Sequence, residues 1–466
     1  MTFASLTFLY LFLPLVLLGY YLIPRRFRNG FLLLASLLFY GWGEPAFLLV
    51  IIFSAFVNYV FGRLIGRCGG QKKKARLLAF TAIGLDLLLL VVFKYTGFLV
   101  ENLSHLLPGL GLTAPEIPLP LGISFYTFQV VAYIADVYRR QVEPTRNFVQ
   151  FFTFMSFFPQ LIAGPIVRYQ DIRDQLIARR ETLSKFAGGI RLLAVGLGKK
   201  VLLANPMGLL WETVSGSDCG ALGAWAGAAA FAFQIYFDFS GYSDMARGLG
   251  RMFGIELPEN FRYPYVARSI TDFWRRWHIT LSTWFRDYVY IPLGGSRQGM
   301  GRTVCNLFVV WALTGLWHGA SWNFLIWGVY YFVLLAAEKL FLGRALERAP
   351  RFVGHLYALL AVAVGWVFFA FTDFGAMGAY LGRMFGAAGA GLGSAGADII
   401  GYLPLFAAAL LASLPAGARW YARRTASGRC AVLLSAAETV VLLLILLLST
   451  AALISQSYNP FLYFRF

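Results

Sequence analysis

Residues 303–338 read TVCNLFVVWALTGLWHGASWNFLIWGVYYFVLLAAE. Two apolar runs, 303–317 and 320–338, are separated by a short break that contains His318. A run of ~20 apolar residues is long enough to cross ~30 Å of hydrocarbon, and a shorter run can cross where the bilayer is thinner. This stretch therefore predicts a pair of membrane-spanning helices that fold back near residues 317–320, with an ionisable side chain at the fold.

The composition of the whole chain supports a membrane protein. Hydrophobic residues make up 59% of the 466 positions and charged residues 13%, whereas soluble domains have about 25% charged residues. The net charge of +18 does not indicate nucleic-acid binding, because the basic residues lie in short gaps between apolar runs rather than on one soluble basic face. The four cysteines are far apart in sequence, so we expect neither a metal site nor a disulfide framework.

Further apolar runs predict a polytopic, all-α protein with about 11–12 spanning helices. The first run is too long for the core of a signal peptide and is followed by Pro24-Arg25-Arg26 without a small-residue cleavage site, so we expect it to be retained. The run 148–166 is broken by Pro159 and Gly164-Pro165, which predicts a re-entrant segment. The expected spans lie near 3–23, 31–46, 47–62, 77–98, 120–138, 201–216, 222–240, 303–317, 320–338, 352–372, 402–417 and 431–454.

The basic residues predict how these spans are oriented. If the N-terminus is outside and the spans alternate, the inside loops contain 37 of the 40 Lys and Arg residues, as the positive-inside rule requires. Both termini, the loop 101–119 and the Gly/Ala-rich stretch 373–400 then lie outside. The inside loops would be 24–30, 63–76, 139–147, 167–200, 241–302, 339–351 and 418–429. We expect one membrane domain, 1–466, whose unusual part is a cytoplasmic-side amphipathic segment at 257–302.

His318 is the first candidate for chemistry. An ionisable group at membrane depth is costly unless it is paired or lines a wet cavity, so it is a functional candidate. Desolvation should keep the imidazole neutral, the form that accepts a proton. Gly315 and Gly319 would let a substrate or another backbone approach closely. From the residues alone, a structural histidine hydrogen-bonded to a neighbouring helix is an equal alternative.

His278 is the second candidate. Apolar residues at 270, 273, 274, 277, 281, 284, 285 and 288 have helical spacing, which predicts a single amphipathic helix in the inner interface. His278 would point inward with Trp274 and Leu281, and Arg275 would lie on the other face. An interfacial helix with a histidine at its polar edge explains this spacing equally well.

Other catalytic patterns are weaker. The stretch 238–244, DFSGYSD, brings serine and aspartate together at an expected membrane edge, but a polar helix end in a turn is the simpler interpretation. The glycine pairs 69–70 and 294–295 lack the Lys-Ser/Thr of a phosphate-binding loop.

Several motifs together resemble the membrane-bound O-acyltransferases, and in particular their bacterial polysaccharide branch, which includes the membrane subunit of alginate O-acetylation. WRRWH at 274–278 is followed about forty residues later by LWHGA at 316–320. The supporting stretches are GISFYTFQ at 122–129, FPQLIAGP at 158–165, DFSGYSD at 238–244, VYIPLGGS at 289–296 and NPFLYFRF at 459–466. The resemblance extends from about residue 3 to the end of the chain.

The resemblance implies a ring of tilted spanning helices, with re-entrant and interfacial helices, around a central funnel or tunnel. It implies acetyl transfer from cytoplasmic acetyl-CoA, with no bound cofactor or metal, towards a polysaccharide hydroxyl outside a bacterial inner membrane. An extracytoplasmic SGNH-type, esterase-fold partner would complete the transfer. The expected partners are thus the polysaccharide, the SGNH-type protein and membrane lipid, and nucleic acid is not expected.

The same resemblance implies which residues form the site. His318 matches the catalytic histidine of the family and would act as base or as transient nucleophile. His278 matches the second motif residue, which is Asn in many eukaryotic members. Trp317 would pack against the His318 ring, and Arg275 and Arg276 would attract the anionic donor at the inner mouth. The other residues expected to line the tunnel are Trp274, Trp277, Ser240, Tyr242, Gln160 and Asn306.

Three other functions stay open at this point. Within the family, the alternative is transfer of D-alanine to teichoic acid, although the chain length and the 373–400 insert favour acetylation. A transporter of lipid or polysaccharide would show matching halves, and none is evident. The third alternative is a scaffold that only recruits the outside partner.

Overall fold

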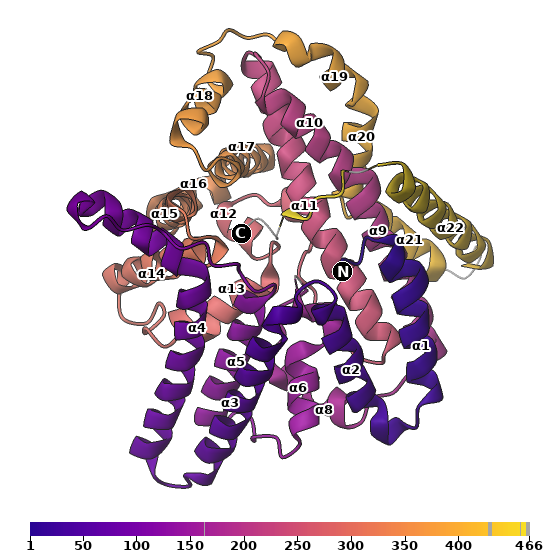
Figure 1. Ribbon diagram of the computed structural model, residues 1–466. Coiled ribbons are helices and arrows are strands. Elements are labelled where there is room, and N and C mark those ends of the chain that lie inside the picture. Colours follow the sequence, from indigo (N-terminus) through magenta and orange to yellow (C-terminus); the bar gives the residue numbers. More distant parts are fainter. Residues whose placement is uncertain (163, 427–430, 457, 463–466) are drawn as a thin grey trace. The chain divides into compact units, whose positions relative to one another are not determined.

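The computed structural model of the chain describes residues 1–162, 164–426, 431–456 and 458–462 (Figure 1). Within these residues the regular secondary structure is helical and contains no β-strand, which confirms the predicted all-α class. The chain forms two compact units. The first contains residues 1–193, 245–258 and 286–288, and the second contains residues 194–244, 259–285 and 289–466.

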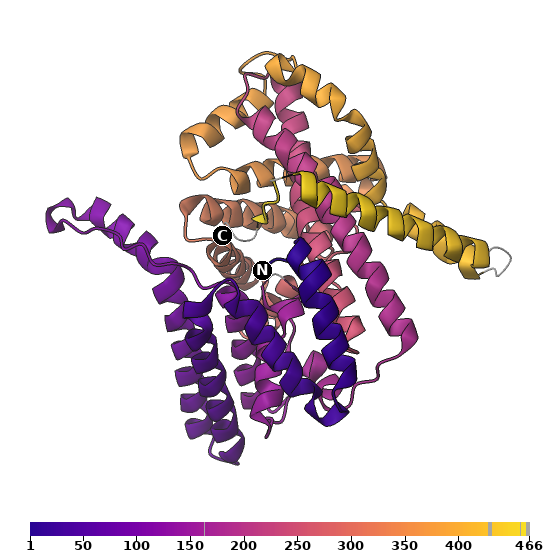
Figure 2. The same ribbon diagram turned by 45° about the vertical axis from the view of Figure 1, so that its right-hand side comes forward.

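The N-terminal part of the first unit is a series of helices joined mostly by short turns, with a longer connection at 107–122 between α4 and α5. Helices α3, α4 and α5 contact one another along their lengths and lie side by side in Figures 1 and 2. The apolar run 148–166 is broken at Phe157, between α6 and α7, as its proline predicted. The helices are η1 (Phe8–Phe12), α1 (Leu13–Leu22), α2 (Arg28–Gly41), α3 (Leu48–Arg67), α4 (Lys72–Leu106), α5 (Ile123–Tyr138), α6 (Phe148–Ser156), α7 (Phe158–Leu161) and α8 (Tyr169–Ile177).

The second unit carries the candidate catalytic histidines. Helices α9 (Leu183–Gly198) and α11 (Ala221–Met252) each contain residues of both units. The other helices of the second unit are η5 (Lys199–Ala204), α10 (Asn205–Ser215), α12 (Ile270–Trp274), α13 (Ile279–Phe285), α14 (Met300–His318), α15 (Trp322–Ala337), η8 (Glu338–Leu342), α16 (Gly343–Arg348), α17 (Arg351–Ala370), α18 (Phe374–Met384), α19 (Gly396–Gly401), α20 (Leu403–Ala412), α21 (Ala416–Ala426) and α22 (Ala431–Ser455).

The helices have the lengths and composition of membrane spans. In the described part of the chain, five helices are long and apolar enough to cross a bilayer by themselves, or six if the pair bent by 60° at Tyr402 is one span. The prediction of about 11–12 spans also counted shorter or more polar helices. One of these is Phe8–Leu22, and another is α14, which begins beside a basic residue. The chain is thus a multi-pass membrane protein.

Two segments predicted as inside loops are largely helical. In 167–200, α8 and α9 form and π-helical turns continue into α10, so the lysines at 199 and 200 are part of a helix. In 241–302, α11 continues to Met252 instead of ending near 240. The sequence prediction began the first of these helices late, at 201, and ended the second early, at 240, because it treated charge as a boundary, whereas here several of the charges are paired within the fold.

The predicted single amphipathic helix around His278 is wrong. The segment is broken between α12 and α13 at residues 275–278, and His278 has a φ of 45°, in the left-handed region. A histidine in this region costs about 1–3 kcal/mol and persists only where the surroundings over-determine it. The helical spacing of apolar residues correctly predicted that α12 and α13 are helices. This spacing continues across residues 275–278, however, and so it does not reveal the turn between the two helices.

Close backbone packing joins α14 to α15 on either side of the turn. A Cβ atom on Gly328 would lie 2.4 Å from the carbonyl oxygen of Trp311, and one on Gly315 would lie 2.4 Å from that of Phe324. Because backbone atoms cannot yield to a Cβ atom in the way that a flexible side chain can, these two positions require glycine. The sequence prediction of a helical hairpin at 303–338 is confirmed.

We predict that Gly328→Ala lowers the melting temperature of the detergent-solubilised protein, since the overpacked contact costs about 1–3 kcal/mol. Gly84→Ala in α4 is the matched control, because nothing lies within 4 Å of its added Cβ. Alanine is also favoured over glycine in a helix by about 0.5–1 kcal/mol, so the control should melt at the parental temperature or above it. Equal melting temperatures for the two variants would contradict the close contact.

Candidate active site

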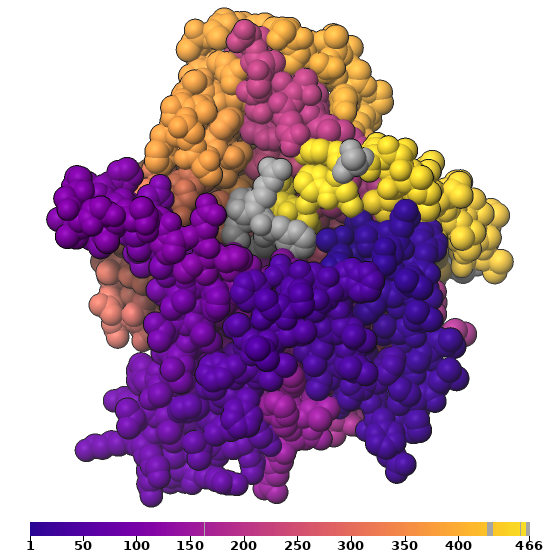
Figure 3. Space-filling view, in the orientation of Figure 1, coloured from indigo at the N-terminus to yellow at the C-terminus, as the bar shows by residue number. Residues whose placement is uncertain are grey.

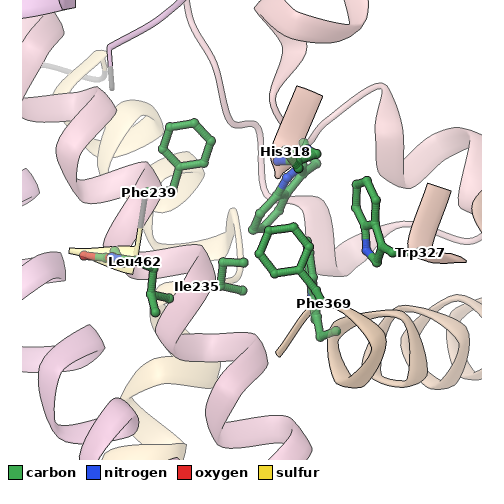
Figure 4. Close-up of a pocket in the computed structure, with 9 residues that line it drawn as sticks. Ile235, Phe239, His318, Trp327, Phe369 and Leu462 are labelled. Atoms are coloured by element: carbon green, nitrogen blue, oxygen red, sulfur yellow. The ribbon is translucent and has the colours of Figure 1, made fainter. Parts of the chain in front are cut away.

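A small cavity in the second unit contains His318 (Figure 4). Its volume is about 20 Å³, which is room for about one water molecule. Figure 4 shows residues of α11 and Leu462 on one side, and His318 with rings of α15 and α17 on the other. The lining residues are Ile235, Asp238, Phe239, Trp277, His318, Trp327, Trp366, Phe369 and Leu462.

His318 is the last residue of α14, and aromatic rings surround its imidazole. The ring centroids of Trp317 and Trp327 lie 4.9 Å from that of His318, and the Phe369 centroid lies at 5.4 Å. All three rings are at 72–82° to the imidazole, so the contacts are edge-to-face. The predicted packing of Trp317 against His318 is confirmed, and the side chain is only 6% exposed.

Asn260 selects one tautomer of His278. The Asn260 Oδ1 atom accepts from Thr280 N at 3.1 Å and lies 3.2 Å from His278 Nδ1. Because a backbone N–H can only donate, the atom that faces it is the amide oxygen, and Nδ1 of His278 must carry the hydrogen that this oxygen accepts. In the neutral ring this places the hydrogen on Nδ1 rather than on Nε2.

His278 lies in the segment that connects α11 to α14, outside the membrane-spanning helices. Burial lowers the pKa of His278 to about 3, because the charged form would lose its hydration. The centroid of its ring lies 4.7 Å from the ring centroid of Phe239, which lines the cavity, and 5.9 Å from that of Trp317. His278 is thus one ring away from His318 and its cavity.

The two tryptophans of the WRRWH motif have different surroundings. Trp277 lines the cavity and lies 4.8 Å from Trp366. Trp274 packs into a buried aromatic cluster, where its ring centroid lies 4.7 Å from that of Trp311 and 4.9 Å from that of Tyr331. Trp277 therefore reaches the site directly, and Trp274 holds α12 against α14 and α15.

The remaining predicted residues of the second unit lie at varied distances from the cavity. Arg275 is exposed, and Arg276 forms an ion pair with Asp272, 2.8 Å between Nε and Oδ1. Ser240 is buried in α11, two residues from the cavity residue Asp238. The ring of Tyr242 packs against that of Phe461, with 4.7 Å between the ring centroids and 31° between the ring planes.

Gln160 and Asn306 are engaged elsewhere. Gln160 belongs to the first unit, where its Nε2 donates to the Phe154 carbonyl at 2.5 Å. Asn306 donates to the carbonyl oxygens of Leu293 and Gly295 at 3.3 and 2.9 Å and so fixes that turn. It lies twelve residues before His318 on α14, which is about 18 Å along a helix. Asn306 therefore supports the VYIPLGGS stretch rather than the cavity.

Several site residues were not predicted. The sequence reasoning noticed Asp238 only as part of a polar helix end, and it gave no role to Asn260, Trp327, Trp366, Phe369 or Leu462. Glu338 was also missed: its carboxylate accepts from the backbone N–H groups of Ile270 and Thr271 at 2.6 and 2.9 Å and so caps α12. A buried acid at the end of an apolar run was the available signal for Glu338, whereas the aromatic residues resemble ordinary core.

The comparison with known proteins decides the family. A model of the membrane-bound O-acyltransferase (MBOAT) family matches residues 139–379, which contain both His278 and His318. The chain belongs to this family. The resemblance drawn from the sequence motifs is confirmed, and the protein is a membrane-bound O-acyltransferase.

Within the MBOAT family, the chain is similar to proteins with related names. A probable alginate O-acetylase AlgI of Pseudomonas putida is 43% identical over 392 residues, which is 83% of this chain and 80% of the relative. A peptidoglycan O-acetyltransferase of Helicobacter pylori is 34% identical over 78% of this chain and 75% of its own length. A teichoic acid D-alanyltransferase of Bacillus subtilis is 29% identical over 47% of this chain and 59% of its own length.

The buried state of His278 in this MBOAT protein predicts a pH-dependent stability. The unfolded chain takes up a proton near pH 6.5, but the folded chain does so only near pH 3. Between these values the unfolded state binds more protons, so the free energy of unfolding falls as pH falls. We expect the melting temperature of the parental protein to fall more steeply between pH 7.5 and 5.0 than that of His278→Asn, with a difference of about 2 kcal/mol at pH 5.

Asparagine is chosen for this variant because it tolerates a positive φ and does not titrate. His105→Asn is the control, since His105 is exposed at the end of α4 and should keep the parental slope. Identical slopes for the parental protein and His278→Asn would contradict a neutral, buried His278.

Proposed function

We propose that the protein transfers an acetyl group from acetyl-CoA, taken up on the cytoplasmic side, to a polysaccharide hydroxyl on the other side of a bacterial inner membrane. Both termini lie outside in this proposal, and an SGNH-type extracytoplasmic partner completes the transfer. The acceptor class agrees with the names of the relatives that cover most of the chain, which act in alginate and peptidoglycan O-acetylation.

One observation carries the proposal: His318 faces a small, largely apolar cavity at the end of a helix, and aromatic rings hold its imidazole in place. A base positioned in this way can remove a proton from an acceptor hydroxyl while water is largely excluded. Exclusion of water matters because a thioester that meets water is hydrolysed rather than transferred.

The proposed step is balanced within the site. The His318 imidazole takes the proton of the hydroxyl that first receives the acetyl group, and the oxygen of this hydroxyl attacks the thioester carbon; the partner then passes the acetyl group on to the polysaccharide. The new C–O bond forms as the C–S bond breaks, and the proton passes to the CoA thiolate that leaves. His278 is a second imidazole near this pocket, with its ring centroid 5.9 Å from that of Trp317, so it can help to position the acceptor hydroxyl.

The donor is proposed to enter near the turn between α12 and α13. Arg275 is exposed there, and a guanidinium suits phosphate groups through its planar fork. The ion pair between Arg276 Nε and Asp272 Oδ1 positions the Arg276 guanidinium. A guanidinium has five N–H donors, so this ion pair does not use all of them.

D-alanyl transfer to teichoic acid is the less supported alternative. The D-alanyltransferase of Bacillus subtilis matches 47% of this chain, against 83% for the alginate O-acetylase of Pseudomonas putida. A transporter without chemistry would give no role to an imidazole held in a small apolar cavity among aromatic rings.

We predict that His318→Ala lowers acetyl incorporation in membranes at least 100-fold, the lower range for loss of a general base. His105→Ala, on an exposed helix end, serves as the control and should keep parental activity. Acetylated polysaccharide is quantified after equal expression has been confirmed by immunoblot. Near-parental incorporation by His318→Ala would overturn the catalytic assignment.

We predict that the purified protein, with its partner, releases CoA from radioactive acetyl-CoA and passes the label to the acceptor. A D-alanyltransferase would label the acceptor only from an activated D-alanyl donor, and a carrier would move polysaccharide without releasing CoA. Transport without CoA release would exclude the enzymatic proposal.

A further inference from the structure

The C-terminal segment 458–462 is bound along α10 and α11 although it is not part of a long helix. In Figure 3 the yellow C-terminal residues lie at the surface beside the magenta residues of these helices. Tyr458 OH donates to Glu212 Oε1 at 3.0 Å, and Asn205 Nδ2 donates to Asn459 Oδ1 at 3.2 Å. Phe461 and Leu462 are only 8% and 6% exposed, so the segment is packed into the second unit.

A buried ion pair holds the backbone of this segment. Lys200 Nζ and Asp238 Oδ1 are 2.7 Å apart, and their side chains are 5% and 3% exposed. Lys200 Nζ also donates to the carbonyl oxygen of Pro460, and Asp238 Oδ2 accepts from Leu462 N at 2.9 Å. Each member of the pair thus bonds to its partner and to one peptide group of the segment.

Stability alone does not explain such a pair. Burying two charges costs several kcal/mol each, and replacing a buried pair by apolar residues is often neutral or stabilising. The arrangement does have a direction, because the ammonium only donates and the carboxylate only accepts. It therefore matches the C=O of residue 460 and the N–H of residue 462 in one orientation.

The ion pair of Lys200 and Asp238 adjoins the candidate active site. Asp238 and Leu462 both line the cavity that contains His318. In Figure 4 the Leu462 side chain lies beside Ile235, opposite His318 and Phe369. Since Leu462 lies outside the long helices, the contacts of segment 458–462 with Lys200 and Asp238 fix this part of the cavity wall.

We propose that Lys200 and Asp238 form a clamp that holds the C-terminal segment against the His318 cavity, and that this placement is required for acyl transfer. Both are positioning residues: they act on the reaction through the wall that they hold. The inference rests on the proposed function for its activity readout, but the position of the segment can be measured without any substrate.

Two double variants of the full-length protein test the clamp. Lys200→Met/Asp238→Leu removes both charges, so no buried charge is left unpaired, but the segment loses both bonds. Lys200→Asp/Asp238→Lys keeps an ion pair but reverses it, so that an acceptor faces a carbonyl oxygen and a donor faces an N–H. If the pair served only the stability of the helices, the reversed pair would rescue the protein.

The first measurement is a timed carboxypeptidase digestion in detergent, read by intact mass. We expect digestion past Leu462 to be at least ten times faster in both double variants than in the parental protein. The control is Arg28→Met/Glu181→Gln, which removes another ion pair, 2.6 Å apart and largely shielded in the first unit, and should leave the protection unchanged. Parental protection in both clamp variants would overturn the proposal.

The second measurement is acetyl transfer. We expect kcat to fall at least tenfold in both clamp variants, equivalent to about 1.4 kcal/mol, with a smaller change in KM for acetyl-CoA, because the wall that moves is next to the reacting histidine. Faster digestion with parental kcat would overturn the required role, and restored protection in the reversed pair would overturn the directional clamp. If the parental protein itself transfers no acetyl group, the proposed function fails, while the digestion still decides whether the clamp exists.

Discussion

The site depends on the contact between Gly315 of α14 and Gly328 of α15. At this contact a Cβ atom on Gly328 would lie 3.3 Å from the Gly315 Cα, so the two backbones touch. Trp327, the neighbour of Gly328, is thereby placed edge-on to His318, and contacts between α15 and α17 add Phe369. One steric requirement at two glycines thus places an imidazole at the end of a helix and surrounds it with rings.

The second requirement is that polar groups in an apolar chain find partners within the fold. The helices on either side of the turn at residues 275–278, α12 and α13, each begin with backbone N–H groups that have no partner within the helix. Asn260 and Glu338 supply these partners from more distant parts of the chain, at Thr280 and at Ile270 and Thr271. The strained φ of His278 is held by such contacts, and the same contacts fix which nitrogen carries the hydrogen.

These constraints have a common consequence for chemistry. The cavity offers the imidazole of His318, the imidazole of His278 one ring away, and a buried carboxylate whose charge is already matched by Lys200. A low-polarity pocket with few, oriented polar groups suits a proton transfer coupled to attack on a thioester. The cavity wall contributed by Leu462 makes the last described residues of the chain part of this environment.

The sequence by itself determined the all-α membrane class, the hairpin at 303–338 and the family, and it made His318 the first candidate for chemistry, because apolar length, an ionisable residue at depth and fixed motifs are local signals. Only the tertiary structure decided the break before His278, the burial of Lys200, and the meeting of α11, α15, α17 and the C-terminal segment around one imidazole. Lys200 appeared to belong to a basic loop because local charge does not reveal a carboxylate that arrives from another helix. The lining of the cavity depends on contacts between residues as far apart as Asp238 and Leu462, and no periodicity within a helix encodes such contacts.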